Sequence, residues 1–365
     1  MYKRVSNCRG RAARRNGNGA VSLLVPLIAG IALGALLFCP AGEKAPSAVP
    51  YELSFVPSSQ KAEPTEAPLP AGTAAPELMT VELDSPLITV SIGGEPVGME
   101  LEDYVLGVVA GEMPASSAPA ALEAQAVAAR TFAALHMAGR ARCKSGCTVC
   151  DDPSCCQAYL SSEQMRRMWG DSFGSNFAKL RAAAENTRGL VCVYEGQLIN
   201  AFYHASSGPA TESSEEVFAC ALPYLVSVES CEGESEVVTR QEFSEGEVVE
   251  LINAAYPEAN MTLPMGEGDL DIWGRSASGR VQLIRIGETV IPGSDLRRVL
   301  GLKSTAFEVE RAGGVVAFTC LGYGHGVGMS QTGANEMAKK GASAEEILAH
   351  YYTGTELARL TFKDG

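Results

Sequence analysis

Positive charge is scarce in this chain beyond its first 42 residues. Those residues hold six of the 29 basic residues and no acid, which leaves 23 Lys and Arg against 43 Asp and Glu in the rest, a net charge of −20. Nucleic acids and other anionic polymers are bound through basic surfaces, so this balance argues against both as ligands. A largely neutral polymer, such as chitin or a wall glycan stripped of its peptides, fits the balance better.

The acid-free N-terminus has the pattern of a membrane anchor. Its basic residues precede an uncharged apolar stretch, 20–39, which as a helix would be about 30 Å long, the thickness of a bilayer's hydrocarbon core. We therefore expect a basic cytoplasmic tail at 1–19, a transmembrane anchor at 20–39, and an extracytoplasmic domain held at the cell membrane. A cleaved signal peptide is the alternative, although its apolar region is usually about 7–15 residues.

Apolar periodicity is absent from residues 40–80, which contain eight of the 19 prolines. This composition predicts an extended linker. The folded part is then expected at 81–360, without internal repeats. Short strands mixed with segregated helices predict an α+β fold with a sugar-binding cleft. The expected helices are 101–112, 120–137, 161–187, 293–300, 331–340 and 344–351, and the expected hairpin turns are Gly93-Gly94, Glu195-Gly196 and Gly313-Gly314.

Histidine is absent from a loop that is unusually rich in cysteine. Five of the eleven cysteines lie within fourteen residues: Cys143, Cys147, Cys150, Cys155 and Cys156. Their spacing resembles a loop wrapped around a tetrahedral metal, so zinc is the first interpretation. A local disulfide knot and free thiols are the alternatives, although adjacent cysteines cannot easily join one another.

Two charged residues stand in otherwise apolar helical segments. Glu112 lies in the last turn of its expected helix, where the helix dipole and apolar neighbours should raise its pKa and suit it to general-acid chemistry. A solvated surface glutamate is the plain alternative. Arg130 lies among alanines and valine and needs an anionic partner, which is either a sugar carboxylate or an internal acid such as Glu112.

Two further segments carry hydrogen-bonding side chains suited to a sugar. The first, 201–208, contains Tyr203, His204, Ser206 and Ser207, but the G-x-S-x-G elbow of a serine hydrolase is missing, so sugar contacts are the better interpretation. The second, 322–331, has glycine at every second position up to Gly328, which lets a ligand or another backbone approach closely. It contributes Tyr323, His325, Ser330 and Gln331. A simple Gly-rich turn is the alternative.

Taken in order, these motifs resemble the stage II sporulation protein D family. The resemblance rests on Glu112-Met-Pro114, the helix 124–132, Cys156-Gln-Ala-Tyr159, the segment 202–208, the segment 324–331, and His350-Tyr-Tyr-Thr-Gly354. It implies a lytic transglycosylase that cleaves MurNAc-β-1,4-GlcNAc bonds of peptide-stripped peptidoglycan. A sporulation amidase and membrane engulfment proteins are the implied partners.

The resemblance also implies roles for individual residues. Glu112 matches the catalytic acid/base of the family and Arg130 a substrate-binding arginine. Tyr203, His204, Ser206 and Ser207 match its sugar-contacting strand, and His325 and Ser330 its Gly-rich edge. One departure concerns the zinc loop, where family members carry histidines that this chain lacks. The expected ligands are Cys147, Cys150 and Cys156, with Cys143 or Cys155 as the fourth.

Three functions remain open from the sequence. A hydrolysing glycosidase needs two carboxylates, whereas a lytic transglycosylase needs one because the muramic acid 6-hydroxyl replaces water. Glu112 is the one candidate catalytic carboxylate among the motifs, which fits the second scheme. The first alternative is a non-catalytic glycan-binding enhancer of a cell-wall amidase, and the second is a metalloenzyme at the cysteine loop. Five thiols favour a closed structural metal site over the metalloenzyme.

Overall fold

The computed structural model describes residues 78–218 and 220–363. The basic tail, the apolar stretch 20–39 and nearly all of the linker lie outside these ranges, so the predictions made for them stay predictions. Within the described ranges, no helix combines the length and the apolar character that crossing a bilayer requires.

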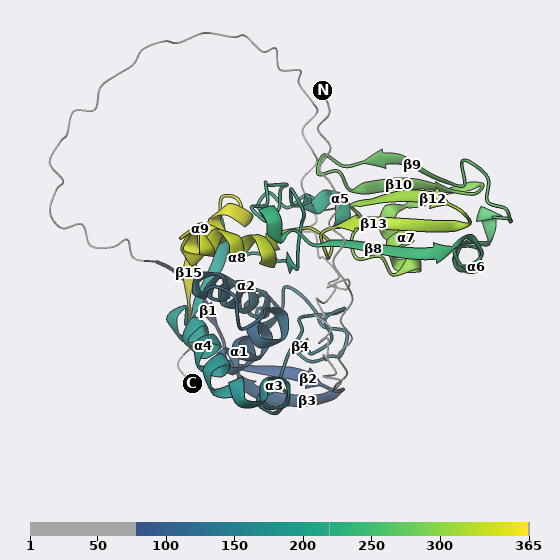
Figure 1. The fold of residues 1–365 in the computed structure, drawn as a ribbon. Coiled ribbons are helices and arrows are strands. Elements are labelled where there is room, and N and C mark those ends of the chain that lie inside the picture. Colours follow the sequence, from purple (N-terminus) through teal and green to yellow (C-terminus); the bar gives the residue numbers. More distant parts are fainter. Residues whose placement is uncertain (1–77, 219, 364–365) are drawn as a thin grey trace, which may run out of the picture.

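The described residues form two lobes, each with its own hydrophobic core (Figure 1). The first lobe combines both ends of the described chain. Its helices are α1 (Leu101–Glu112), α2 (Pro119–Met137), α3 (Ser162–Trp169), α4 (Phe173–Asn186), α5 (Ser214–Phe218), α8 (Gln331–Lys339) and α9 (Ala344–Tyr351). Its strands are β1 (Met79–Leu83), β2 (Leu87–Ile92), β3 (Glu95–Glu100), β4 (Val149–Cys150), β5 (Leu190–Tyr194), β6 (Gln197–Leu198), β7 (Tyr203–His204), β14 (Met329–Ser330) and β15 (Glu356–Phe362).

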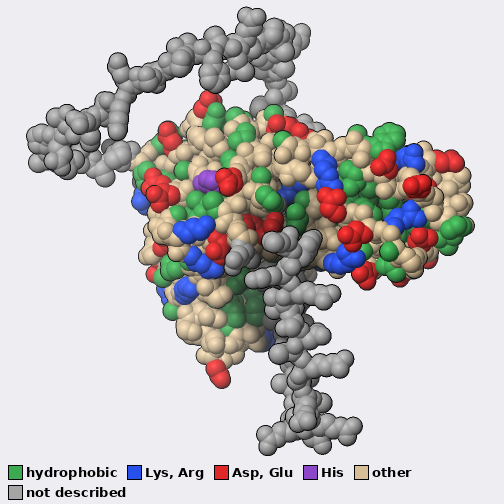
Figure 2. Space-filling view, turned by 45° about the horizontal axis from the view of Figure 1, so that its top comes forward, with side chains coloured by type: hydrophobic (Ala, Val, Ile, Leu, Met, Phe, Trp, Pro, Cys, Tyr) green, Lys and Arg blue, Asp and Glu red, His purple; other side chains and the backbone are tan. Residues whose placement is uncertain are grey.

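The second lobe, residues 238–321, is inserted into the first. It contains β8 (Val238–Ser244), α6 (Glu245–Ala255), β9 (Leu270–Arg275), β10 (Val281–Ile286), β11 (Thr289–Pro292), α7 (Gly293–Leu300), β12 (Phe307–Ala312) and β13 (Val315–Leu321). Two three-stranded sheets, in the orders β11-β10-β9 and β12-β13-β8, pack with α6 and α7 around the second core. Acidic and basic side chains are interspersed over the face of this lobe that Figure 2 shows. The α+β expectation is therefore confirmed for the described residues.

Several expected elements are confirmed almost to the residue, and others are not. The helices 101–112, 293–300 and 344–351 and the strands beside Gly313-Gly314 form as predicted. The helical segment 161–187 divides into α3 and α4, because Gly170 adopts a φ of +50° between them. The strands β8 and β9 were missed, and β1 pairs with β15 rather than with its neighbour in sequence.

Two glycines on α1 allow the segment after the cysteine loop to lie directly against this helix. A Cβ atom at Gly107 would come within 2.1 Å of the Tyr159 ring, and one at Gly111 within 2.8 Å of the Ala158 backbone. The Leu160 amide also donates to the Gly107 carbonyl, at 3.0 Å. This close contact brings the backbone of 157–159 to the C-terminal end of α1, where Glu112 lies.

The Gly-rich segment 322–331 packs against the segment 201–208. The strands β7 and β14 pair in parallel, with Tyr203 opposite Met329 and His204 opposite Ser330. A Cβ atom at Gly328 would lie 2.1 Å from the Phe202 carbonyl oxygen, and Gly328 has a φ of +73°, which favours glycine. Of the two uses predicted for these glycines, the structure therefore shows the close approach of another backbone.

Candidate functional site

Glu112 is a nearly buried carboxyl at the C-terminal end of α1. Only 8% of its surface is exposed, and its Oε1 accepts a hydrogen bond of 2.7 Å from the Ala158 amide. Burial raises its pKa from 4.5 to about 7, while the hydrogen bonds from Ala158, Tyr203 and Gln331 oppose this shift. A carboxyl with a pKa near neutrality can both donate and accept a proton at physiological pH.

A cluster of neutral polar side chains surrounds Glu112. The Tyr203 hydroxyl donates to Gln157 Oε1 at 2.8 Å, and Gln157 Nε2 donates to the Tyr104 hydroxyl at 3.1 Å. Gln331 Nε2 donates to Gln125 Oε1 at 3.3 Å. None of the groups that shift the pKa of Glu112 is charged, so no cation offsets the cost of ionising it. The cluster surrounds the carboxyl and lowers its pKa by less than burial raises it.

Arg130 lies in the core of the first lobe and is fully buried. Its Nε and Nη2 donate to the two carboxylate oxygens of Glu102, at 2.9 and 2.6 Å, and its remaining hydrogen bonds go to backbone carbonyls of 126, 184 and 190. Of the partners predicted for this arginine, the structure shows an internal acid, and that acid is Glu102 rather than Glu112. The structure does not bring Arg130 to a surface that a glycan could reach, and we assign it a structural role.

Two of the expected sugar-binding serines are hydrogen-bonded to a buried acid, Glu232. The hydroxyl of Ser206 donates to Glu232 Oε2, and the hydroxyl of Ser330 donates to its Oε1 at 2.6 Å. The Ser207 amide and the Ser230 hydroxyl add bonds of 2.6 and 3.0 Å to the same oxygen. Glu232 thereby joins the two motifs, and these hydroxyl protons are already used within the protein. The sequence offered no signal for Glu232, which lies in a generally acidic stretch.

The two histidines of the motifs lie next to each other, with ring centroids 5.6 Å apart. His204 Nδ1 donates to the Val327 carbonyl at 3.1 Å, so its Nε2 accepts the hydroxyl of Ser207 at 2.6 Å. In His325 the Nδ1 accepts from the Val327 amide at 3.0 Å, which places the ring proton on Nε2. Burial, followed by the positive charges of Arg297 and Arg280, lowers the pKa of His325 to about 3, so its ring is neutral.

Four cysteine sulfurs lie within 4.8 Å of one another in the loop beside α1: Cys143, Cys150, Cys155 and Cys156. Four thiols at this separation could hold a metal ion. Burial raises the pKa of the Cys150 thiol to about 12, so a bound cation is what would keep this group as a thiolate. The predicted ligand set needs one correction. Cys147 is outside the group, because it follows the Cys143–Gly146 turn, and Cys143 and Cys155 both belong to it.

The chain is similar to known proteins of one family. A sequence profile described as stage II sporulation protein matches residues 97–194, which include α1, α2 and the cysteine loop. Stage II sporulation protein D of Bacillus amyloliquefaciens is 37% identical over 266 residues, which cover 71% of this chain and 74% of that protein. The chain belongs to the stage II sporulation protein D family. The same protein of Bacillus subtilis strain 168 is 36% identical, with the same two coverages.

The chain is also similar to a protein of a different name. The amidase enhancer of Bacillus subtilis strain 168 is 30% identical over 300 residues, which cover 69% of this chain and 40% of that protein.

The structure adds two residues near Glu112 that the sequence analysis did not single out. Gln157 belongs to the Cys156-Gln-Ala-Tyr159 motif and could have been found there, whereas Tyr104 lies in an apolar helix without any such signal.

Proposed function

We propose that this protein is a peptidoglycan lytic transglycosylase, which cleaves MurNAc-β-1,4-GlcNAc bonds of peptide-stripped glycan strands and leaves 1,6-anhydroMurNAc ends. Membership in the stage II sporulation protein D family supports a role in the cell wall during sporulation. The observation that carries the enzymatic proposal is Glu112, a single nearly buried carboxyl with a pKa near 7 in a neutral polar cluster. One such group can serve both proton transfers of the reaction.

In the first step, protonated Glu112 gives its proton to the glycosidic oxygen as the bond to the muramic acid C1 breaks. The GlcNAc fragment leaves with a new 4-hydroxyl, and the carboxylate faces the positive charge that develops at C1. In the second step, the carboxylate takes the proton of the muramic acid 6-hydroxyl while O6 bonds to C1. This closes the 1,6-anhydro ring, restores protonated Glu112 and consumes no water.

We propose that the Tyr203 hydroxyl and the Gln331 amide hold Glu112 during these steps, because both lie close enough to lower its pKa. Stabilising the carboxylate too strongly would weaken the acid, and the neutral character of these partners avoids that. We propose His204, Ser206, Ser207, His325 and Ser330 as the second layer of the site. They fix the relative position of the 201–208 and 322–331 segments through Glu232 and the Val327 backbone.

Incubation of the purified protein with peptide-free glycan strands tests the proposal. We expect products whose mass is lower by one water than that of hydrolysis products, because the anhydro ring forms in place of a free reducing end. Mass spectrometry distinguishes the two. Products of ordinary hydrolytic mass would contradict a lytic mechanism, and intact glycan with normal binding would favour the second candidate below.

The second candidate is a glycan-binding enhancer of a cell-wall amidase. The similarity to the amidase enhancer supports it. In this case the protein would present glycan to the amidase without cleaving it. Stimulation of a purified cell-wall amidase by both the wild type and Glu112→Gln, with no anhydro product from either, would select this function.

We further propose that the four-cysteine group binds zinc as a closed structural site. Cys143, Cys150, Cys155 and Cys156 supply four sulfur donors, which suit tetrahedral zinc, and leave no open position for a reacting water. When bound, the metal would join the loop before the 157–159 segment into one rigid unit. That segment provides the Ala158 amide to Glu112, so the site would act on the carboxyl only through the position of the backbone.

Metal analysis of protein purified under reducing conditions should find about one zinc per chain. Cys155→Ser should lose the zinc, whereas Cys147→Ser should keep it, because only the first residue belongs to the four-cysteine group. Chelation should lower the melting temperature before it lowers activity. Retention of zinc by Cys155→Ser together with its loss from Cys147→Ser would contradict this ligand set, and absence of metal with disulfides present would contradict the zinc site.

The location of the protein is also a proposal. The sequence of 1–39 supports a single-pass cell-membrane protein with the described lobes outside the cytoplasm, where peptidoglycan lies. A sporulation amidase that strips the glycan and membrane proteins of engulfment are the partners that we propose.

A further inference from the structure

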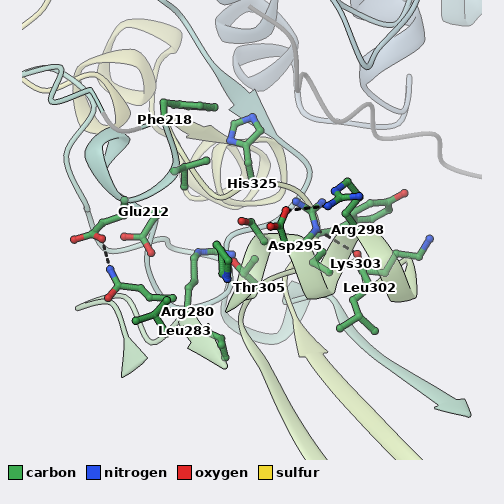
Figure 3. Close-up of a pocket in the computed structure, with 18 of the residues that line it drawn as sticks. Glu212, Phe218, Arg280, Leu283, Asp295, Arg298, Leu302, Lys303, Thr305 and His325 are labelled. Carbon is green, nitrogen blue, oxygen red and sulfur yellow. Dashed lines mark hydrogen bonds and ion pairs between the residues drawn. The ribbon is translucent and has the colours of Figure 1, made fainter. Parts of the chain in front are cut away.

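A cavity of about 740 Å³ lies where the two lobes meet, and Glu112 is not among the residues that line it. The first lobe contributes Phe202, Phe218 and His325, and the second contributes Arg280, Leu283 and the residues around α7. In Figure 3, His325 lies above the hollow, Arg280 below it, Glu212 to the left, and Asp295 with Arg298 to the right. Four Arg or Lys residues and three Asp or Glu residues line this cavity. Basic residues are therefore in excess here, although the whole chain has a net charge of −14.

Three buried side chains of this cavity each keep one N–H group without a regular hydrogen bond to the described residues: Nε of Arg280, Nη2 of Arg297 and Nε2 of His325. Their residues are 2%, 7% and 3% exposed. The Tyr203 carbonyl is close enough to His325 to oppose its pKa shift, but not in hydrogen-bonding geometry. Unpaired donors that are buried to this degree are costly, so their convergence on one cavity indicates a ligand that accepts hydrogen bonds.

The remaining bonds of these residues hold them in place. Arg280 donates to the Ser207 carbonyl at 2.8 Å and to the Ser304 hydroxyl at 2.9 Å, and its guanidinium lies so close to Gly326 that a Cβ there would be 2.4 Å from Cζ. Arg297 Nε donates to the Leu302 carbonyl at 3.2 Å. Arg280 and Arg297 are close enough that each charge acts on His325. The three donors are therefore positioned before any ligand arrives.

The acids of the cavity wall already have partners, unlike these donors. Glu212 Oε2 accepts from the hydroxyls of Ser276 and Ser278, at 2.5 and 2.8 Å. Asp295 pairs with Arg298 at 3.1 Å and accepts the Tyr256 hydroxyl at 2.8 Å, and Glu216 accepts the Gln282 amide. Unsatisfied groups of the wall are consequently donors rather than acceptors, which favours an anion over a neutral or cationic ligand.

We propose that this cavity binds a sugar-borne carboxylate, through the free N–H groups of Arg280, Arg297 and His325. A carboxylate has lone pairs enough for three donors and a single charge. A phosphate dianion fits less well, because Glu212 and Glu232 lie close enough to act on Arg280 and offset part of the positive charge. Apolar surface from Phe202, Phe218 and Leu283 would cover the ring and the side group that carries the carboxylate.

The carboxylate that we assign to the cavity is the lactyl group of a muramic acid residue, an assignment that rests on the proposed function. In a strand that still bears stem peptides this group is an amide, so it has no charge and carries a bulky substituent. The cavity would then select peptide-stripped strands by their free carboxylates. The two sites are adjacent at consecutive residues, since Phe202 lines the cavity and the Tyr203 hydroxyl acts on Glu112.

Titration calorimetry with the full chain tests the assignment. The probes are the disaccharide GlcNAc–MurNAc, the same disaccharide with its lactyl group as a carboxamide, and chitobiose. We expect GlcNAc–MurNAc to bind at least about tenfold more tightly than the other two. Arg297→Gln and His325→Asn should remove this preference. Arg298→Gln is the matched control, because its guanidinium lines the same cavity but is occupied by Asp295, and the preference should persist in it.

Melting temperatures of all variants establish which of them fold. If Arg297→Gln does not fold, His325→Asn still tests the proposal. Equal affinity for the carboxylate and the carboxamide would overturn the proposal, as would persistence of the preference in both variants or tighter binding of inorganic phosphate in competition. Glu112→Gln separates this proposal from the proposed function. A carboxylate preference without cleavage would leave the cavity assignment standing, and cleavage without the preference would remove the assignment alone.

Discussion

Glu112→Gln is expected to reduce the formation of 1,6-anhydro products at least about 100-fold, because an amide can neither donate nor accept the proton of the two steps. The substitution preserves shape, and the Gln carbonyl oxygen can still accept from the Ala158 amide. Quantifying anhydro ends by mass spectrometry over a time course checks the result. Glycan binding should be unchanged. Full activity in this variant would exclude Glu112 as the acid/base.

The pH dependence of the melting temperature of Glu112→Gln tests whether Glu112 is needed for folding. The folded protein binds the proton of Glu112 more tightly than the unfolded chain does, since its pKa is raised from 4.5 to about 7. Stability from this group is thus fully present below pH 4.5 and is lost as the pH rises through 7, by up to about 3 kcal/mol. Glu112→Gln lacks this penalty, so we expect it to melt higher than the wild type at pH 8 and to lose that advantage toward pH 5. A lower melting temperature at pH 8 would instead indicate a structural carboxylate.

Arg130→Ala is expected to destabilise the first lobe by about 3–5 kcal/mol, because it leaves Glu102 without its partner and opens space in a fully packed core. Arg181→Ala is a matched control, since Arg181 forms an i,i+4 pair with Glu185 in which the two side chains are 62% and 56% exposed. That substitution should cost less than about 1 kcal/mol. Urea unfolding followed by circular dichroism measures both.

A result of the opposite kind would restore the role that the family resemblance implied for Arg130. If Arg130→Ala kept its stability and specifically lost affinity for muramic acid oligosaccharides, the arginine would be a substrate-binding residue. The structure favours the first outcome because five hydrogen bonds of the guanidinium end on protein atoms. We propose instead that the sugar carboxylate is bound in the cavity between the lobes.

The sequence predicted the local features of this protein better than it predicted which residues contact each other. The helix that ends at Glu112 was predictable from its apolar spacing, and a raised pKa followed from the helix dipole and the apolar neighbours. Burial is the main cause of the shift in the structure. This burial depends on residues 157–159 lying against Gly107 and Gly111, a contact across about fifty residues that no local pattern encodes.

Which internal acid pairs with Arg130, and which four cysteines lie together in the loop, could not be predicted for related reasons. Glu102 lies in the first turn of α1, where a solvated acid is also favourable, so its pairing with α2 depends on how the two helices pack. Spacing cannot choose four cysteines among five, because it does not reveal that Cys147, which follows the Cys143–Gly146 turn, lies outside the group. The strands β8 and β9 escaped prediction because both carry charged residues and the inward face of each is only half-buried.

The pairing of the first described strand with the last one sets the order in which this protein can fold. β1 hydrogen-bonds to β15, and the helices α8 and α9 complete the first core only after the whole second lobe has been synthesised. The second lobe is continuous in sequence and can form its core as soon as its own residues have been synthesised. The lobe that holds Glu112 must instead wait for its last residues. A chain that ends before Glu356 would therefore have an ordered second lobe beside an unfinished first one, and we expect proteases to cut the lobe that holds Glu112 first.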